Sequence, residues 1–437
     1  MKKTILSLLV AIGLIGRVLA QITSTNILAV PLPLMPAPSG GNDFNTIISQ
    51  NFKYWKNSNG VINESVLNAL MTNTSLTTYQ SLAVSAIKRY AFSEAGGNQY
   101  NEFLAISFPN LSSLTNTNGV IGDALIRRYN LLYKNYAYYN TALFANNLPT
   151  FQKIHQGAGG DCYLLSIIGA MAHRNPTDIK NLVTWSPGGY TVTFPTNWSR
   201  NYKMNKKQIF ISAPTLCETL TYNSTPLNQQ FSSTSVADGI WLPVLQKATG
   251  IVLQNTNQYP IPNGSYYAKP VENNPEPMDY IFIGGAPDYM MALYTGNDVI
   301  ASDLNPGLYP NIALKKQKLI SELSYCTSNN RLMEMCITKL TFYNSPNKLP
   351  QNQLQKLSDL GLYTGHCYSV LGYNSTNQMV TLWNPFGNNI SVSGVQNLTN
   401  GYNMTNGVFQ MSLDTIINQI NGAFCFERQS ADPNLLQ

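Results

Sequence analysis

The stretch QGAGGDCYLL, Gln156 to Leu165, decides how the rest of this chain is interpreted. Three glycines, an acidic residue and a cysteine come directly before an apolar run. In one interpretation this is a turn before a buried helix, and the cysteine is a small hydrophobic residue. In the other, Cys162 is a nucleophile at the positive N-terminal end of that helix, where a thiolate is stabilised. The choice depends on which partners the rest of the chain supplies.

Candidate partners are few, because the chain has three histidines, at positions 155, 173 and 366. His366, in GHCYSVLGY, opens a predicted strand, and Asn384 ends the next one, in VTLWNPFG. Neighbouring antiparallel strands would place Asn384 beside His366, where it would orient the ring. Gln156 precedes the glycines and could donate to an oxyanion. Cys162, His366, Asn384 and Gln156 then form the nucleophile, base, orienting residue and oxyanion donor of a Cys-His-Asn peptidase.

Other chemically notable residues have simpler interpretations. We expect His155 and His173 to be surface or packing residues. Asp161 is expected to be the N-cap of the helix that begins near Cys162. Trp241 is expected in the core, and core packing is also favoured for Trp383 over a role in shielding the cysteine from water.

These motifs resemble the papain-like protease core of the calpain family. QGAGGDCYLL is similar to the family's Q-G-x-x-G-D-C-W-L-L, GHCYSV to G-H-A-Y-S-V, and WNPFG to R-N-P-W-G. Three further segments match the family in the same order along the chain: residues 239–248, 284–296 and 406–420. The resemblance covers roughly residues 147–426. It implies an α+β fold of two lobes, with Cys162 and Gln156 on a helical lobe, His366 and Asn384 on a β-rich lobe, and the active site between them.

Departures from the family pattern concern calcium. Lys153 stands where calpains have a calcium-binding aspartate, and no Asp or Glu occurs between Asp359 and Asp414. A hard cation needs several oxygen ligands, carboxylates above all. We therefore expect that the calcium sites of the core are lost, that the protein uses no cofactor, and that no calcium-binding domains follow the core. Tyr163 and Phe386 replace two tryptophans of the family.

The N-terminus indicates export. Residues 1–20 combine Lys2 and Lys3 with an apolar run and small residues before Gln21, which is typical of a secretory signal peptide. An uncleaved anchor is the alternative, although the run is short for a bilayer. We expect a secreted or extracellular protein, or a periplasmic one if the source is a Gram-negative bacterium.

Charge excludes two classes of partner. Removing residues 1–20 takes away three basic residues and no acid, so the formal net charge falls from +6 to +3. That excess is too small to predict nucleic-acid binding. No later apolar segment is longer than the run within residues 1–20, so stable membrane insertion is not expected either.

Domain organisation follows from the changes in pattern. Residues 21–41 are a proline-rich linker, and 42–145 form a small helical domain that is a candidate propeptide, inhibiting the enzyme by covering its cleft. The protease core occupies 146–437, with the helical lobe at about 146–260 and the β-rich lobe at about 261–437. Strands are predicted at 190–194, 207–212, 366–373 and 378–384.

The six cysteines are too few for a disulfide scaffold in 437 residues. Cys326 and Cys336 are close enough in sequence for a local bridge. Cys367 should point to the face of its strand opposite to His366 and serve a structural role. The cysteines and histidines do not have the spacing of a zinc site.

Taken together, the sequence predicts a secreted, calcium-independent cysteine endopeptidase of the calpain type that acts on protein or peptide substrates. Two alternatives stay open. One is a catalytically silent binding protein on a protease fold, and the other is a transglutaminase-like enzyme that transfers acyl groups to amines.

Overall fold

The structure is a computed structural model, and the predicted signal peptide and linker lie outside its described residues. It describes residues 42–93, 106–107, 120–136, 142–145, 148–156, 160–195, 208–222, 239–255, 276–277, 279–282, 284–304, 311–337, 362–387 and 404–433.

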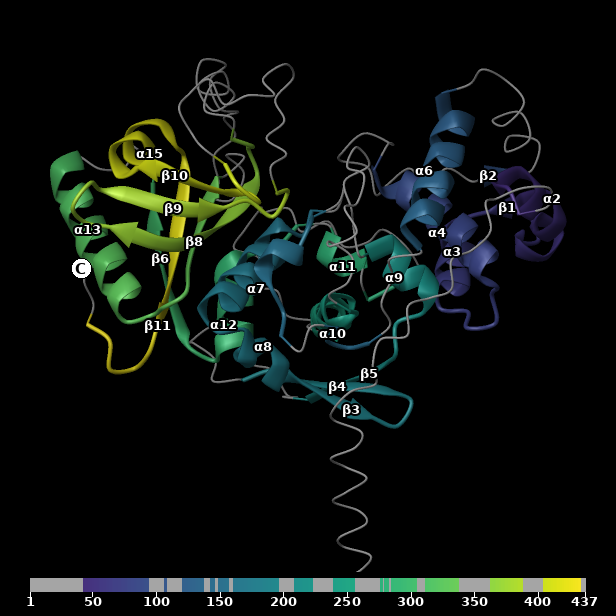
Figure 1. The fold of residues 1–437 in the computed structure, drawn as a ribbon, viewed down its shortest axis with the longest axis horizontal. Helices are drawn as coiled ribbons and strands as arrows, with labels where there is room; N and C mark the ends of the chain where they lie inside the picture. The colour runs from purple at the N-terminus through teal and green to yellow at the C-terminus, as the bar shows by residue number, and fades with distance from the viewer. Residues whose placement is uncertain are drawn as a thin grey trace, which may run out of the picture.

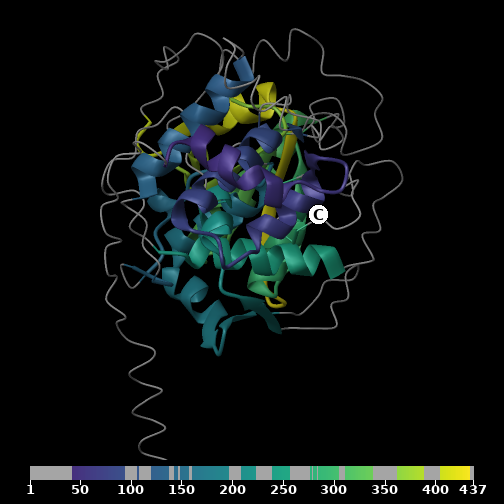
Figure 2. The same cartoon turned by 90° about the vertical axis from the view of Figure 1, so that its right-hand side faces the viewer.

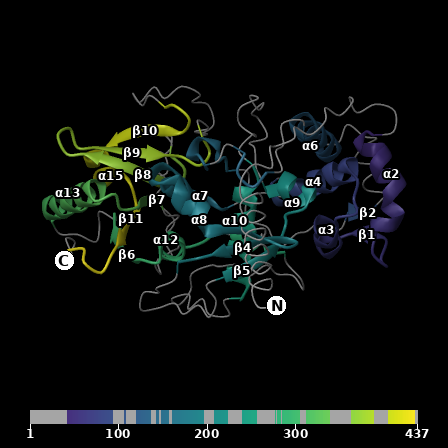
Figure 3. The same ribbon diagram turned by 60° about the horizontal axis from the view of Figure 1, so that its bottom comes forward.

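Three groups of elements follow one another along the long axis of the molecule (Figures 1 and 3). The N-terminal helices lie at one end, a six-stranded sheet lies at the other, and the remaining helices with a small sheet lie between them. Figure 2 views the molecule from the end of the N-terminal helices, with the large sheet behind them. The fold is α+β, as predicted.

The N-terminal helices form because apolar residues recur at helical spacing. Their bounds are α2 (Phe44–Trp55), α3 (Glu64–Met71), α4 (Thr78–Ser93) and α6 (Val120–Tyr136). Asp43 caps α2 by accepting from the backbone N–H of Thr46 at 3.0 Å. A short strand pair that the sequence did not predict, β1 (Val61–Ile62) with β2 (Ile106–Ser107), joins this group.

The central group is the helical lobe. It contains η1 (Phe151–Lys153), α7 (Cys162–Arg174), α8 (Pro176–Leu182), α9 (Leu216–Tyr222), α10 (Trp241–Asn255), α11 (Asp279–Phe282) and α12 (Pro287–Thr295). Its antiparallel sheet consists of β3 (Val183–Ser186), β4 (Gly189–Thr193) and β5 (Gln208–Ser212), in agreement with the two strands predicted there. Because α11 contacts α10, this group extends beyond residue 260.

The β-rich lobe is a six-stranded antiparallel sheet in the order β10-β9-β8-β7-β11-β6. The strands are β6 (Asp298–Asp303), β7 (Met333–Ile337), β8 (His366–Asn374), β9 (Met379–Trp383), β10 (Val408–Ser412) and β11 (Gly422–Arg428). Helices α13 (Ile312–Ser328) and α15 (Leu413–Gln419) cover one face, and α7 and α12 pack on the other (Figure 1). Strand β7 is therefore buried on both faces.

The N-terminal helices and the helical lobe share one continuous hydrophobic core. Helix α4 packs against α9, and the fully buried Lys88 of α4 pairs with Asp279 of α11 at 3.1 Å. Ser85 of α4 also donates to the carbonyl oxygen of Cys217 in α9, at 3.1 Å. A second core lies between the large sheet and α13 and α15.

The disulfide differs from the prediction. Cys336 of β7 is bonded to Cys367, which stands directly opposite it on β8. Cys326 belongs to α13 and the second core, on the other face of the sheet, so the expected Cys326–Cys336 bridge is wrong. The physical reason is strand alternation, which turns Cys336 and Cys367 together toward α7.

Candidate active site

Cys162 is the first residue of α7, as the glycine-rich stretch predicted. Its side chain is buried, and Sγ lies 4.0 Å from the carbonyl oxygen of Gly365, the residue before His366. Asp161 occupies the N-cap position, and its backbone carbonyl accepts from the N–H groups of Leu164 and Leu165. The first turn of α7 thus brings the cysteine to the start of β8.

Asp161 does not cap the helix through its side chain, contrary to the expectation. Its carboxyl group is buried and accepts from Nε2 of Gln246 at 2.9 Å. Burial raises the pKa of Asp161 to about 7. The Asp161 side chain therefore points toward α10, where the Gln246 amide donates to it.

His366 begins β8, and its Nε2 lies 2.8 Å from Oδ1 of Asn384, just after β9. The same oxygen accepts from the backbone N–H of Phe386 at 3.0 Å. An amide oxygen can only accept hydrogen bonds, so Nε2 must carry the proton in this contact. In a neutral ring the unprotonated nitrogen is then Nδ1, the form in which histidine can act as a base.

Asn384 is held by its backbone as well as by its side chain. Its N–H donates to the carbonyl oxygen of Gly407 at 2.9 Å. Gly407 has φ +80°, and a Cβ there would lie 2.7 Å from the carbonyl oxygen of Asn384. Only glycine fits this close approach without displacement, so the segment before β10 fixes the position of Asn384.

Gln156 is buried, and its backbone N–H donates to the carbonyl oxygen of Pro385 at 2.8 Å. The segment before the glycines therefore contacts the turn that carries Asn384. His155 packs beside the same turn, within 3.6 Å of where a Cβ on Gly387 would lie. His173, near the other end of α7, meets the ring of Phe151 edge to face. Both contacts fit the packing roles expected for these histidines.

Aromatic rings surround His366. Phe386 stacks on its imidazole with ring centroids 4.5 Å apart and planes 8° apart, while Tyr363 and Tyr368 meet it edge to face. The sequence indicated Phe386 but not the two tyrosines. Trp383 instead packs in the core against Phe151, with its Nε1 donating to the carbonyl oxygen of Asn406.

Burial sets the electrostatics of the pair. It raises the pKa of the Cys162 thiol to about 12, opposed by a hydrogen bond from the backbone of Cys367. It lowers the pKa of His366 to about 4, although the bond to Asn384 opposes the shift. The thiolate expected at a helix N-terminus is therefore not favoured in this arrangement, because desolvation outweighs the helix dipole. Desolvation thus disfavours the charged form of both groups.

Comparison with known families agrees with this geometry. A family model described as calpain family cysteine protease matches residues 135–396, well over half of the chain. The chain belongs to the calpain family of cysteine proteases. None of the curated proteins compared with it matches. The matched range includes Cys162, His366, Asn384 and Gln156, while β11, the strand between β7 and β6, lies beyond it.

A calpain-family chain raises the question of metal sites. Among the described residues, one group of three potential ligands comes together, namely Glu334, Cys336 and Cys367. Its two sulfur atoms are joined in the disulfide and are not thiolates. None of the helices in the described part of the chain combines the length and apolar character that crossing a bilayer requires.

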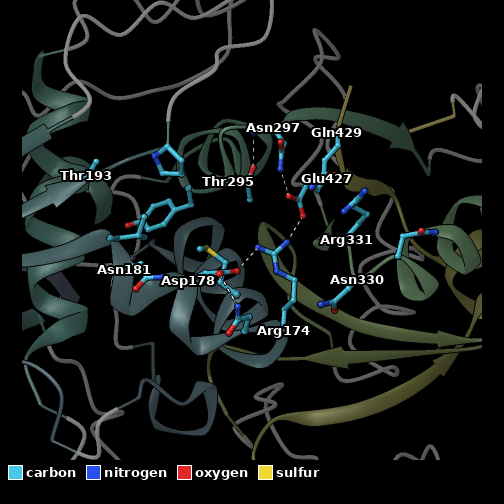
Figure 4. Close-up of a pocket in the computed structure, with 16 residues that line it drawn as sticks. Arg174, Asp178, Asn181, Thr193, Thr295, Asn297, Asn330, Arg331, Glu427 and Gln429 are labelled. Carbon is cyan, nitrogen blue, oxygen red and sulfur yellow. Dashed lines mark hydrogen bonds and ion pairs between the residues drawn. The ribbon is translucent and has the colours of Figure 1, made fainter. Parts of the chain in front are cut away.

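A separate cavity of about 590 Å³ lies at the opposite end of α7 (Figure 4). Arg174 there pairs with Glu427 of β11 at 2.6 Å and with Asp178 at 3.2 Å. Asn297 donates to the other oxygen of Glu427, at 2.6 Å. At about 1.5 Å per residue, the 13 residues of α7 place this cavity roughly 18 Å from Cys162. It is therefore distinct from the site of the cysteine.

Sequence reasoning missed the polar contacts behind Cys162. Ser166 of α7 contacts Glu334 of β7, and Ser369 of β8 donates to the carbonyl oxygen of Ser166 at 2.5 Å. All three side chains are buried. One signal was present: MEMCI places a single acidic residue within an apolar strand, where an unpaired carboxylate is costly.

Proposed function

We propose that this calpain-family protein is a cysteine endopeptidase in which Cys162 is the nucleophile and His366 the general base. Asn384 orients the imidazole, and the Gln156 amide with the Cys162 backbone N–H binds the oxyanion. The contact between His366 Nε2 and Asn384 Oδ1, 2.8 Å, is the observation that carries the proposal, because it leaves Nδ1 as the basic nitrogen.

The neutral state of the pair sets the first step. His366 Nδ1 takes the Sγ proton as the sulfur attacks the peptide carbonyl, so charge develops only when the oxyanion forms. Collapse of the tetrahedral intermediate breaks the C–N bond, and His366 gives the proton to the leaving amine. Water, deprotonated by His366, then hydrolyses the thioester and releases the acid with the Cys162 thiol.

Export and calcium independence belong to the same proposal. The Cys336–Cys367 disulfide supports export, because disulfides persist in oxidising compartments. The lysine at position 153 supports activity without calcium, since a cation replaces an expected oxygen ligand.

The N-terminal helices are proposed to stay attached to the active enzyme. A propeptide that blocks the cleft would contact both lobes, whereas these helices pack against α9 and α11 and lie on the far side of the helical lobe from the large sheet (Figure 1). A protein substrate would therefore reach Cys162 without their removal.

An epoxide-type cysteine-protease inactivator tests the proposal together with a denatured protein substrate. We expect labelling at Cys162 and cleavage that Cys162→Ala abolishes and a chelator leaves unchanged. An unlabelled Cys162 with no cleavage would indicate the silent binding protein instead. Incorporation of a primary amine into the substrate in place of cleavage would indicate the acyl transferase. Mass spectrometry of the active enzyme shows whether residues 42–145 remain attached.

A further inference from the structure

Among the described residues, Glu334 is a buried acid that is not paired with a cation, and it is linked to Cys162 through Ser166. Glu334, on β7, is fully buried, and its Oε1 is hydrogen-bonded to the hydroxyl of Ser166. The Ser166 hydroxyl also lies 2.7 Å from the backbone carbonyl oxygen of Cys162, one helical turn earlier. Glu334, Ser166 and the Cys162 carbonyl thus form a row of hydrogen bonds from the sheet to the proposed nucleophile.

The number of available protons determines which group donates in each of these hydrogen bonds. A serine hydroxyl has one proton to donate, and the Cys162 carbonyl oxygen can only accept. If Ser166 donates to Cys162, then Glu334 must donate to Ser166 and is a carboxylic acid. An ionised Glu334 would take the serine proton, and the bond to the Cys162 carbonyl would be lost.

The surroundings of Glu334 favour the acid. Cys425 of β11 stands opposite it on one side, and Ser369 of β8 stands opposite on the other. Asp288 at the start of α12 adds a further acidic group nearby, and the sulfur atoms of the neighbouring disulfide are uncharged. In the described part of the chain Glu334 forms no ion pair, and its Oε2 has no hydrogen-bond partner.

Burial raises the pKa of Glu334 well above its ordinary value. The hydrogen bond with Ser166 opposes this shift, and the charge of Asp288 adds to it. A carboxylate here would in turn raise the pKa of Cys162, because its negative charge would disfavour a thiolate nearby. A neutral Glu334 links α7 to the sheet without raising the pKa of Cys162 in this way.

We propose that Glu334, as a neutral carboxylic acid, is a positioning residue for Cys162. It donates to Ser166, which donates to the Cys162 carbonyl, and so fixes the first turn of α7 against β7. This inference rests on the proposed role of Cys162 as nucleophile. A glutamine at position 334 can still donate through its amide, whereas a leucine cannot, so the two substitutions separate the hydrogen bond from the charge.

The test is the rate at which iodoacetamide alkylates Cys162, measured from pH 5 to pH 10 by mass spectrometry of the Cys162 peptide. E334Q should keep most of the wild-type rate wherever Glu334 is protonated, and it should exceed the wild-type rate only at a pH high enough to ionise Glu334. Each unit by which ionised Glu334 raises the Cys162 pKa lowers the rate about tenfold below that pKa. E334L should be about tenfold slower than wild type throughout.

Controls keep the outcomes distinct. Asp414→Asn removes a carboxylate from the far face of the sheet and should leave the profile unchanged, and thermal unfolding checks that each variant folds. If E334L does not fold, Ser166→Ala removes the same link and should slow alkylation in its place. E334Q as slow as E334L, or an unaffected E334L, would each overturn the inference. A wild-type Cys162 that never reacts would instead overturn the proposed function.

Discussion

The helical lobe forms two interfaces that bury acidic residues in opposite ways. At the N-terminal interface, between α4 and α9–α11, Asp279 is paired with the fully buried Lys88, which also donates to Oδ1 of Asn68. At the inter-lobe interface, between α7 and β7–β9, Glu334 contacts the Ser166 hydroxyl and lies beside the disulfide, and in the described part of the chain it is not paired with a cation. Opposite charges surround Asp279 at the first interface, whereas neutral polar groups surround Glu334 at the second. The ion pair between the lobes, Arg174 with Glu427, lies at the opposite end of α7 from Cys162.

The difference follows from what each interface must tolerate. Breaking a buried ion pair strongly destabilises a protein, because removing one partner leaves the other as an uncompensated buried charge. That suits a permanent attachment of the N-terminal helices. A fixed charge beside Cys162 would instead shift the pKa values of the thiol and of His366. A neutral acid gives the inter-lobe interface a hydrogen bond without that shift.

Replacing Lys88 with methionine should have the largest effect. Asp279 would be left buried without its cation, and we expect the free energy of unfolding to fall by about 3–5 kcal/mol. Chemical denaturation followed by circular dichroism measures the change. The double variant Lys88→Met with Asp279→Asn should recover most of it, because the remaining group is uncharged. A loss under about 1 kcal/mol for the single variant would show that the N-terminal interface does not depend on the pair.

Removing the disulfide next tests the sheet side of the inter-lobe interface, because the bridge joins β7 to β8. The bridge closes 31 residues of chain, so Cys336→Ala with Cys367→Ala should lower stability by about 2–4 kcal/mol. Denaturation without reductant measures the difference. Adding reductant should bring the wild type toward the variant and leave the variant unchanged. Equal stability of the two proteins without reductant would mean that hydrogen bonds and packing alone hold β7 to β8.

Adding one methyl group to α7 should have a smaller effect at the same interface. A Cβ on Gly169 would lie 2.2 Å from the ring of Trp383, the residue before Asn384. Gly169→Ala should therefore lower stability by about 1–3 kcal/mol, even though alanine favours helix by up to about 1 kcal/mol. We also expect a lower kcat/KM, because Trp383 would displace Asn384 from His366.

Gly372→Ala is the matched control for that substitution. The nearest atom to its added Cβ lies 4.0 Å away, so stability and kcat/KM should both stay near wild type. A Gly169→Ala protein that behaves like this control would show that α7 and β9 are not tightly packed.

Glu334→Gln should match wild type most closely at low pH, and the difference should grow as pH rises. Because the pKa of Glu334 is raised in the folded state, its contribution to stability is fully present below the unfolded pKa, about 4.3, and is lost as pH rises through the folded pKa. Between these values wild type should lose about 1.4 kcal/mol per pH unit relative to the variant. Thermal unfolding of both proteins across pH 4–9 measures the slope, and parallel curves would contradict a neutral Glu334.

Many of the helices and strands could be predicted from local patterns in the sequence. The apolar spacing of Phe44, Ile47 and Ile48 predicts α2, and the alternation after His366 predicts β8. Helical and strand periodicities depend on near neighbours in the chain, so they are visible without tertiary contacts. The sequence also predicted that the strands at 366–373 and 378–384 pair and bring His366 and Asn384 together. A short hairpin allows few registers between its two strands.

Contacts between distant segments could not be predicted in this way. The disulfide joins Cys336 to Cys367 rather than Cys326, because the partner is chosen by which face of the sheet each residue occupies. Lys88 meets Asp279 across 191 positions of sequence, and no local pattern pairs them.

The sequence by itself therefore determined the residue types available for chemistry and the elements on which they lie. Cys162 begins a helix because glycines and a buried apolar run surround it, and His366 opens a strand for similarly local reasons. Tertiary structure alone decided their environment. Packing of α7 against the sheet buries Cys162 and His366, which disfavours the charged form of both, and it links Glu334 to the cysteine through Ser166. Desolvation depends on everything that surrounds a group, and that is fixed only when the whole chain has folded.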